Sequence, residues 1–492
     1  MAKKSDSDQH TPAAPFPMSQ VSNGEFCPYP ATPKQQLAAR LVMEETDKHA
    51  RRAGMSRRQF LCTAAGTATT FMVLNKIYGL DAWGDNAVLP VQSVHCEDIA
   101  AGNELLDHDV FVMDVQTHHL DIDHPAAEAI CGALNFCDTF GAVLGADCSE
   151  LDCPEKLGQM SFIKELFIDS QTSMGVISGV PNGTILGPQL MADTRDLTNQ
   201  LAGSERTLIQ AMIDPLRPPG EITSLDSFEH QVNDLGAKAL KCYTYNGNWR
   251  LDDEAVAYPM LAEAERLGLG LINVHKGLAT LFGFDPEYVR VTDFPKVAAD
   301  WPKLKFCAYH SGYFFPGEHP TGLDGITELI QTVESMPRRD ARRIYAEIGS
   351  SFAIALLSGP DQAAHMMGQL LKTFGSKRIL WGTDSMWWGS PQFLVDAFWN
   401  LEIPAAMRQE FGYPKLTKRK KQRILGLNAA KLYGVKRRDR NNLCTVPPDA
   451  LDGMQEASGG FRANRSLRAY GPRTPAEYLA LLKQEARVLA QG

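Results

Sequence analysis

Eight short runs of apolar and β-branched residues recur along this chain, and their repetition constrains the fold more than any other feature of the sequence. After the first gap the runs begin roughly every 30–40 residues, which is the length of one strand followed by one helix. Their apolar character is nearly continuous, as expected for strands that are covered on both faces. The runs are Val110–Val115, Gly175–Val180, Thr207–Ile213, Ala237–Tyr243, Leu269–Val274, Leu304–Tyr309, Arg343–Ile348 and Arg378–Gly382.

Segments between these runs carry apolar residues at helical spacing, as in Asp252–Leu267, Leu323–Ser335 and Asp361–Phe374. Alternating strands and helices of this kind predict an α/β protein with a (β/α)8 TIM barrel over residues 107–436. The first gap is about twice as long as the others, so we expect an insertion between strands 1 and 2 that covers the barrel mouth. A doubly wound sheet is the alternative, but no G-x-G-x-x-G sequence follows the first run.

Composition excludes several classes of protein. The chain has 492 residues, of which 44% are hydrophobic and 22% charged, as expected for a globular protein with a large core. Lys and Arg number 49 against 58 Asp and Glu, and the net charge of −9 argues against a nucleic-acid partner. No stretch approaches the roughly 18–20 apolar residues of a membrane-spanning helix. We therefore expect neither a nucleic-acid partner nor a stable membrane span.

The first 88 residues differ from the rest, and we expect disorder from Met1 to about Gln36. The sequence S-R-R-Q-F-L at Ser56–Leu61 precedes an uncharged run from Phe60 to Leu74. This pattern resembles a twin-arginine export signal. The resemblance implies that the twin-arginine machinery exports the folded protein to the periplasm or the cell exterior, with cleavage between Leu80 and Val88. An ordinary helix with a basic start is the alternative, and it would leave the protein in the cytoplasm.

Four of the 10 cysteines lie close together in the predicted insertion, namely Cys131, Cys137, Cys148 and Cys153. In an oxidising compartment they could form two disulfides, and in a reducing one they could bind zinc. Their spacing lacks the paired C-x-x-C of structural zinc sites. Unpaired buried thiols are a third alternative.

Polar residues follow several of the predicted strands. Catalytic groups of a barrel lie at the carboxyl ends of its strands, where the loops converge on one face. Imidazoles and a carboxylate that meet there can hold a divalent cation and leave a position for water, whose pKa the ion lowers. The strand-end residues are Gln116 and His118, Lys241, His275 and Lys276, His310, and Asp384. Asp384 would then accept the proton of water, and His310 would stabilise charge on the substrate oxygen.

Three short sequences carry a family resemblance: His310-Ser311-Gly312, Gly382-Thr383-Asp384, and the segment Ile424–Gly434, ILGLNAAKLYG. From Val110 to Val435 the chain resembles the amidohydrolase superfamily. The resemblance is to the amidohydrolase-related branch, which includes aminocarboxymuconate-semialdehyde decarboxylase. It implies that His118 and His275 are metal ligands, that His310 is catalytic, and that Asp384 is both a ligand and a base.

The sequence departs from this family at one position. The first strand of the family usually ends in H-x-H, two metal ligands, but Gln116 stands in place of the first histidine. A neutral amide oxygen is a poorer ligand for Zn²⁺ than imidazole. We expect one divalent metal, most simply zinc, although some relatives work without metal. His119 cannot replace the ligand, because adjacent strand residues point to opposite faces and His119 should face away from His118.

Other residues are candidates for substrate binding. A strand-four lysine is carbamylated in some superfamily branches and bridges two metals, but the loss at Gln116 argues against two metals here. Lys241 is instead expected to bind an acidic substrate, with a strand residue facing the helices as the alternative, and Lys276 and Arg250 are similar candidates for carboxylate recognition. Aromatic residues at the mouth, with Tyr309 and Trp388 foremost, are expected to contact a planar or cyclic substrate. The wider group adds Tyr313, Phe314, Phe315 and Trp387.

The last segment, residues 437–492, is rich in Asn, Pro, Gly and Arg up to Pro475 and predicts an extended arm. A short amphipathic helix is predicted over Ala476–Leu489. An arm of this kind can wrap a neighbouring subunit, which would make the protein a homo-oligomer.

These observations predict a metal-assisted hydrolase of a C–O or C–N bond in a small cyclic or carboxylated substrate. The alternative is a lyase, a decarboxylase or hydratase, at the same site. A third interpretation is an exported binding protein whose catalytic site has decayed, with Gln116 as the trace.

Overall fold

The computed structural model describes residues 17–22, 26–80, 87–124, 157–181, 183, 185–278 and 285–451, together with residues 475, 478 and 479. The clustered cysteines Cys131, Cys137, Cys148 and Cys153 lie outside the described residues, as does most of the predicted insertion. Most of the segment from Leu80 to Val88, where signal cleavage was predicted, also lies outside them.

Each of the eight predicted runs coincides with a strand. The third run is divided at Gln210 into two short strands, β3 and β4. The strands are β1 (Met113–Thr117), β2 (Met174–Ile177), β3 (Thr207–Ile209), β4 (Ala211–Met212), β5 (Leu240–Tyr243), β6 (Leu271–Gly277), β7 (Lys305–Tyr313), β8 (Ile344–Glu347) and β9 (Ile379–Leu380).

The strands close into a parallel barrel. Their order is β1-β2-β3 in one ladder and β4-β5-β6-β7-β8-β9 in the other, and every pairing is parallel. The loop after β9 returns to β1, since Val115 N donates to Trp381 O at 3.1 Å and His118 N donates to Ser385 O at 2.7 Å. This closure confirms the predicted (β/α)8 barrel and brings the end of the last strand next to the end of the first.

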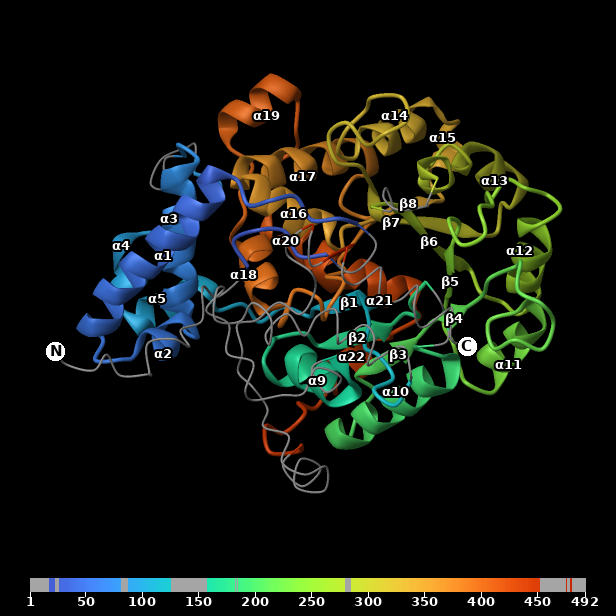
Figure 1. The fold of residues 1–492 in the computed structure, drawn as a ribbon, viewed down its shortest axis with the longest axis horizontal. Coiled ribbons are helices and arrows are strands. Elements are labelled where there is room, and N and C mark those ends of the chain that lie inside the picture. Colours follow the sequence, from blue (N-terminus) through green and yellow to red (C-terminus); the bar gives the residue numbers. More distant parts are fainter. Residues whose placement is uncertain are drawn as a thin grey trace.

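Helices surround the strands on the outside, as Figure 1 shows for α12, α13, α14 and α17. The predicted helices at 252–267, 323–335 and 361–374 correspond to α12, α14 and α17. The barrel helices are α10 (Pro188–Ala202), α11 (Phe228–Asn233), α12 (Ala257–Arg266), α13 (Phe294–Asp300), α14 (Thr327–Ser335), α15 (Arg338–Ala341), α16 (Ser351–Ser358), α17 (Pro360–Phe374) and α18 (Gln392–Asn400). They are followed by α19 (Ala405–Phe411), α20 (Lys418–Gln422), α21 (Asn428–Leu432) and α22 (Arg437–Asn441).

The barrel interior is filled by side chains from several strands, including Met113, Val176, Ala239, Leu271 and Tyr309, all of them buried. A larger cluster lies between the strands and the helices. The barrel is therefore a packed core rather than a channel, and ligands must bind at one end of it.

Five helices before the barrel form a group at the left of Figure 1. They are α1 (Pro33–Arg52), α2 (Arg57–Leu61), α3 (Ala64–Ile77), α4 (Ser93–Glu97) and α5 (Ile99–Leu106). The prediction of disorder up to about Gln36 was wrong for the described residues, since Val21 and Phe26 are buried and α1 begins at Pro33. Thr32 caps α1 through its hydroxyl and Gln35, a capping box that the sequence analysis overlooked.

The signal-like segment forms α2 and α3, and α3 packs against the barrel. Phe71 of α3 contacts Phe393 of α18, with ring centroids 5.5 Å apart. The Tyr78 hydroxyl just beyond α3 donates to Leu357 O at 3.1 Å. Whether this segment also directs export stays a prediction. None of the helices in the described part of the chain has both the length and the apolar character required to cross a membrane.

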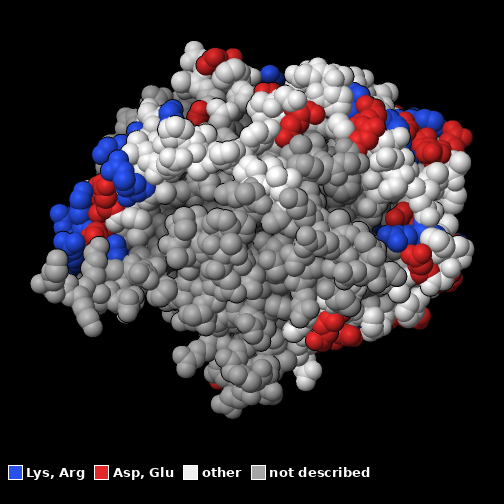
Figure 2. Space-filling view, viewed as in Figure 1, with Lys and Arg blue, Asp and Glu red and all other residues white. Residues whose placement is uncertain are grey.

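Figure 2 shows Lys and Arg gathered on the N-terminal helices, with Asp and Glu among them. Arg40 pairs with Glu44 at 2.7 Å and Arg51 with Asp47 at 3.4 Å, one helical turn apart on α1. Exposed pairs of this kind contribute only a few tenths of a kcal/mol each. Because acidic side chains lie among the basic ones, this face is not a continuous basic surface.

The described part of the C-terminal arm lies on its own barrel. Arg206 donates to Cys444 O at 2.7 Å, and Cys444 N donates to the Ser204 hydroxyl at 2.9 Å. Of the helix predicted over residues 476–489, only Tyr478 and Leu479 are described, and both are helical. The contact of the remaining arm with a second subunit stays a prediction.

Candidate active site

Six of the predicted site residues come from five strands or the loops that follow them, and they meet at the carboxyl end of the barrel. Each has an exposed fraction of 3% or less. The set consists of Gln116 and His118 from the end of β1, Lys241 from β5, His275 from β6, His310 from β7 and Asp384 from the loop after β9. The parallel order of the strands explains the convergence, since the carboxyl ends of all barrel strands lie on one face.

Asp384 is the centre of this cluster. Its Oδ1 lies 3.2 Å from His118 Nε2 and accepts a hydrogen bond from Gln116 Nε2 at 3.0 Å, and its Oδ2 accepts one from the Ser350 hydroxyl at 2.6 Å. Trp388 Nε1 in turn donates to the Ser350 hydroxyl at 3.1 Å. Burial alone would raise the pKa of Asp384, but His118 and His310 together with Ser350 lower that pKa to about 2. The carboxylate is therefore ionised at neutral pH.

His310 lies beside this carboxylate and is held in one tautomer. Its Nδ1 lies 2.9 Å from Gly349 O, a carbonyl that can only accept, so Nδ1 carries the proton of the neutral ring. Burial lowers the pKa of His310 to about 4, against the opposing influence of Asp384. The neutral ring therefore presents the lone pair of Nε2 to the cluster, where Gln116 Nε2 lies 3.3 Å away.

His118 and His275 each make a hydrogen bond to a backbone carbonyl. His118 Nδ1 donates to Ser178 O at 2.6 Å, which directs Nε2 at Asp384. His275 Nε2 donates to Gly277 O at 2.8 Å, and its ring lies 4.6 Å from that of His310. Burial, reinforced by the charges of neighbouring groups, lowers the pKa of His275 well below its usual value, so this ring is neutral.

The backbone is strained at the site. Positive φ angles occur at His310 (57°), Ser311 (53°), Ser350 (50°) and Asp384 (61°). Non-glycine residues rarely adopt this left-handed region, and such residues concentrate at functional sites. Here the turned backbone lies in the last part of β7 and in the loops after β8 and β9, and it directs the polar side chains inward.

Lys241 contributes a basic side chain to the cluster. Its Nζ lies 3.9 Å from the centroid of the Tyr309 ring and 4.5 Å from that of Tyr243. Aromatic faces attract a cation at such distances. The Tyr309 hydroxyl points into the barrel, where it donates to Val115 O at 2.8 Å and accepts from Gln210 at 2.7 Å. Tyr309 thus presents its ring to Lys241 rather than its hydroxyl to the cluster.

Two predicted substrate-binding residues lie elsewhere. Lys276 pairs with Asp293 at 2.6 Å and packs against Phe294 of α13, on the helix side of the barrel. Arg250 donates to both carboxylate oxygens of Asp252, at 2.8 and 3.1 Å. His119 faces away from His118, as predicted, and its Nε2 accepts a hydrogen bond from the Thr194 hydroxyl at 2.8 Å.

Three polar residues of the site were not predicted from the sequence. Glu347 ends β8 fully buried, where Oε2 accepts the backbone N–H of His310 at 3.0 Å; burial raises its pKa to about 8. Asp114 accepts the Thr383 N–H at 3.0 Å and so ties β1 to the Asp384 loop, and burial raises its pKa to about 7. Ser350 is the third. An acidic residue at the end of an apolar strand was the available signal for Glu347.

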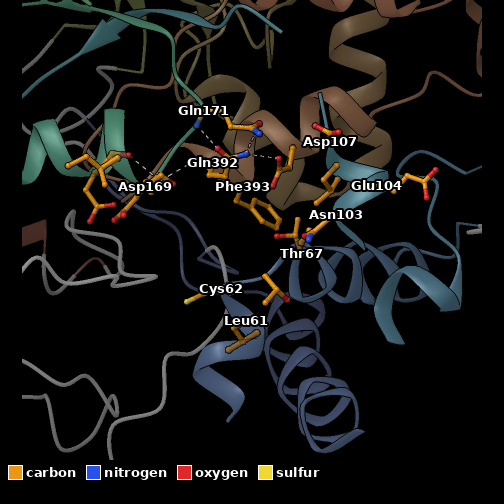
Figure 3. Close-up of a pocket in the computed structure, with 17 residues that line it drawn as sticks. Leu61, Cys62, Thr67, Asn103, Glu104, Asp107, Asp169, Gln171, Gln392 and Phe393 are labelled. Atoms are coloured by element: carbon orange, nitrogen blue, oxygen red, sulfur yellow. Dashed lines mark hydrogen bonds between the residues drawn. The ribbon is translucent and has the colours of Figure 1, made fainter. Parts of the chain in front are cut away.

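Two cavities in the described structure lie outside this cluster. The first, of about 580 Å³, lies between the N-terminal helices and the barrel. It is lined by Cys62 and Asn103 from the N-terminal part and by Phe393 of α18 (Figure 3). The second, of about 820 Å³, is lined in part by Tyr313 and Phe315. These two aromatic residues were predicted at the barrel mouth, and Phe315 packs against Phe26 of the N-terminal segment at 5.4 Å. Neither cavity is lined by a residue of the cluster.

The described side chains do not form the predicted zinc site. Among the residues that the structure describes, no three His, Cys, Asp or Glu side chains are grouped so as to hold a metal ion. His118 Nε2 and Asp384 Oδ1 face one another, but Gln116 directs its N–H, a donor, at Asp384. A catalytic zinc usually has three protein ligands.

Comparison with known proteins finds one matching family and several similar solved structures. The amidohydrolase family profile matches residues 191–435. The chain is similar to an uncharacterized TIM-barrel protein from Bordetella bronchiseptica, with 15% identity over 68% of this chain and 100% of that one, and a TM-score of 0.42. It is also similar to 5-carboxyvanillate decarboxylase from Sphingomonas paucimobilis, with 13% identity over 67% and 100% of the two chains and a TM-score of 0.41. No curated protein matches the sequence.

A closed parallel barrel with ionisable residues at the carboxyl ends of its strands defines an enzyme of the (β/α)8 class. The family match and the segment at 424–434 narrow the assignment from this fold class to one superfamily. The chain belongs to the amidohydrolase superfamily, whose members are enzymes that generally use a divalent metal.

Proposed function

We propose that this enzyme hydrolyses a C–O or C–N bond in a small carboxylated or cyclic substrate. The observation that carries the proposal is the pairing of an ionised Asp384 with a neutral His310 inside a buried cluster. A negative charge and an unprotonated imidazole side by side can orient water and accept its proton. The proposal distributes the roles differently from the sequence-based expectation, in which Asp384 was the base.

In this mechanism His310 Nε2 accepts the proton of the attacking water, because the neutral ring has its only N–H on Nδ1. The same tautomer cannot stabilise an anion through Nε2. His118 Nδ1 faces Ser178 O and its Nε2 faces the Asp384 carboxylate, and both partners accept, so the proposed mechanism takes this ring in its doubly protonated form. As water adds to the substrate carbonyl and the C–O or C–N bond breaks, the leaving atom takes its proton from His118 Nε2.

Lys241 adds a positive charge to the site in this proposal. Held between Tyr309 and Tyr243, its ammonium group is suited to bind a substrate carboxylate or the oxyanion that forms on the carbonyl. Trp388 also lies at the site, because its Nε1 donates to the Ser350 hydroxyl, and its indole offers a flat apolar surface. Both features suit a small planar acid or lactone.

A lyase is the second candidate, because a carboxylate bound by the buried Lys241 can also be the group that leaves. In a decarboxylation the C–C bond to the carboxylate breaks, CO2 leaves, and the carbon takes a proton from His118. The two candidates need the same residues but differ in whether water is consumed. Zinc has no step in either proposal, because the described side chains do not supply a three-ligand set.

A product screen over lactones, amides and hydroxybenzoates tests the proposal and separates its two branches. We expect turnover in one class and a fall of at least ~10² in kcat for Asp384→Asn. Asp396→Asn is the matched control, because Asp396 is another buried carboxyl, hydrogen-bonded by Gln392 at 2.8 Å away from the site. Unchanged turnover in Asp384→Asn would overturn the proposal.

Export through the twin-arginine machinery is a further part of the proposal, supported by the sequence S-R-R-Q-F-L at residues 56–61. It would place the enzyme in the periplasm or outside the cell. A homo-oligomer formed through the C-terminal arm is likewise proposed from composition, and light scattering of the purified enzyme would measure it.

A further inference from the structure

We infer that the Gln116 amide takes the place of a metal ligand and holds an active site that works without a resident metal ion. The inference rests on the proposed function for the reaction itself, but its central measurement, metal content, does not depend on activity. It starts from a conflict between what the family generally uses and what the side chains of this chain offer.

The hydrogen-bonding character of the two neighbours fixes the orientation of the amide. Asp384 Oδ1 accepts a hydrogen bond from Gln116 Nε2 at 3.0 Å. His310 Nε2 also accepts, because the proton of that ring is on Nδ1, and it lies 3.3 Å from the same nitrogen. The NH2 group therefore donates toward both. A metal ligand would instead need Oε1, the lone-pair atom, on that side.

The amide oxygen points to the opposite side, toward the loop after β8. A Cβ atom added at Gly349 would lie 2.5 Å from Gln116 Oε1, so the oxygen packs against the backbone of that glycine. A flipped amide would direct its oxygen at the Asp384 carboxylate and at the lone pair of His310. The carboxylate and the imidazole lone pair would both repel the amide oxygen, and only a cation between the three acceptors could offset that repulsion.

His275 Nε2 donates to Gly277 O at 2.8 Å, so the remaining lone pair of this ring is on Nδ1, and the lone pair of His310 Nε2 faces the Gln116 amide at 3.3 Å. Among the described residues no three His, Cys, Asp or Glu side chains are grouped so as to hold a metal ion, and the two potential ligand atoms that face each other directly are His118 Nε2 and Asp384 Oδ1, at 3.2 Å. Their bond is an ion pair that a cation would have to break. The Gln116 N–H thus provides the positive partner for Asp384 that a metal ion supplies elsewhere in the superfamily.

The geometry gives a sharp test in the variant Gln116→His. An imidazole at this position would join the two facing ligand atoms and complete the three N and O ligands of a zinc site. Native enzyme, purified without chelator from cells grown with added zinc, should hold far less than one equivalent of any divalent metal. Gln116→His should hold about one equivalent, and Zn²⁺ should raise its Tm but not that of the native enzyme.

Gln210→His is the matched control. Gln210 is also buried inside the barrel, but it bonds Val115 O and Tyr309 rather than Asp384. Its histidine variant adds an imidazole to the interior without a carboxylate beside it and should hold no metal. Elemental analysis of the two variants and the native enzyme separates a specific site from nonspecific uptake.

The outcomes are distinct even if a variant fails to fold. Native enzyme that holds about one equivalent of metal, and loses it in His118→Ala, overturns the inference by itself. Activity that a chelator abolishes overturns the inference but leaves the proposed function intact. Native enzyme that holds no metal and shows no turnover in the product screen overturns the proposed function but leaves the inference intact.

Discussion

The imidazole of His118 lies 3.2 Å from the carboxylate of Asp384, and both groups are almost fully buried. His118 follows the first barrel strand and Asp384 follows the last, so the pair exists only when the barrel is closed. The pair therefore links the electrostatics of the site to the stability of the whole fold.

The pair predicts a specific loss of stability in acid. The pKa of Asp384 falls from 3.8 to about 2 on folding, so its stabilising contribution is fully present above pH 3.8 and is lost as pH falls through about 2. Asp384→Asn lacks this contribution at every pH. Denaturant unfolding should therefore show the native enzyme more stable than the variant near pH 6, with the difference shrinking steadily below pH 4. A constant difference would contradict the assignment of an ionised Asp384.

Glu347 predicts the opposite dependence. Its pKa rises from 4.5 to about 8 on folding, so the folded enzyme keeps a proton that the unfolded chain has lost. The unfolded state binds fewer protons across this interval, and stability falls as pH rises from 4.5 to 8. Glu347→Gln removes that titration. The stability of the variant relative to the native enzyme should rise between pH 5 and 8 and then level off, as followed by urea unfolding at constant ionic strength.

Two buried lysines should respond differently to the same substitution. Lys276→Met leaves Asp293 buried without its ion-pair partner and should destabilise the fold by about 3–5 kcal/mol. Lys241 instead rests on two aromatic rings beside the site. Lys241→Met should lower kcat/KM for a carboxylated substrate by roughly 10–100-fold, with a smaller change in stability. Equal effects of the two substitutions on kcat/KM would place Lys241 outside the substrate site.

How far the sequence predicts this enzyme depends on the kind of signal. Periodic apolar runs located every barrel strand, and strand ends located His118, His275, His310 and Asp384. Alternation of side chains along a strand correctly predicted that His119 faces away from the cluster. The same rule predicts that Lys276 points to the helix side, opposite its neighbour His275. The sequence analysis did not apply the rule there, and so assigned Lys276 to the substrate.

Other features depend on tertiary contacts that no local pattern carries. The donor direction of the Gln116 amide follows from the two acceptors that the fold brings to it from β7 and from the loop after β9. Burial of Glu347 shifts its pKa because strands β7 and β9 enclose it, although its position at a strand end was visible. The N-terminal helices were missed because polar residues dominate the exposed face of α1.

The packing of α3 gives a stability prediction. Phe71 is fully buried and contacts Phe393 of α18, so Phe71→Ala should cost about 3–5 kcal/mol if the N-terminal helices and the barrel unfold together. Leu37→Ala on the exposed face of α1 is the control and should change stability by less than about 0.5 kcal/mol. A separate early transition in calorimetry, shifted by Phe71→Ala alone, would show that the helices unfold independently of the barrel.

Export can be tested without disturbing that packing. Arg57 is partly exposed and pairs with Asp47 at 3.3 Å, a contact that a lysine can keep. The double substitution of Arg57 and Arg58 by Lys should therefore leave Tm nearly unchanged, since an exposed pair contributes little. If the twin-arginine machinery reads this pair, the variant should accumulate in the cytoplasm as folded enzyme, whereas the native chain should be found in the periplasm or the medium. Fractionation with an activity assay measures both, and undiminished export of the variant would leave α2 and α3 with a structural role alone.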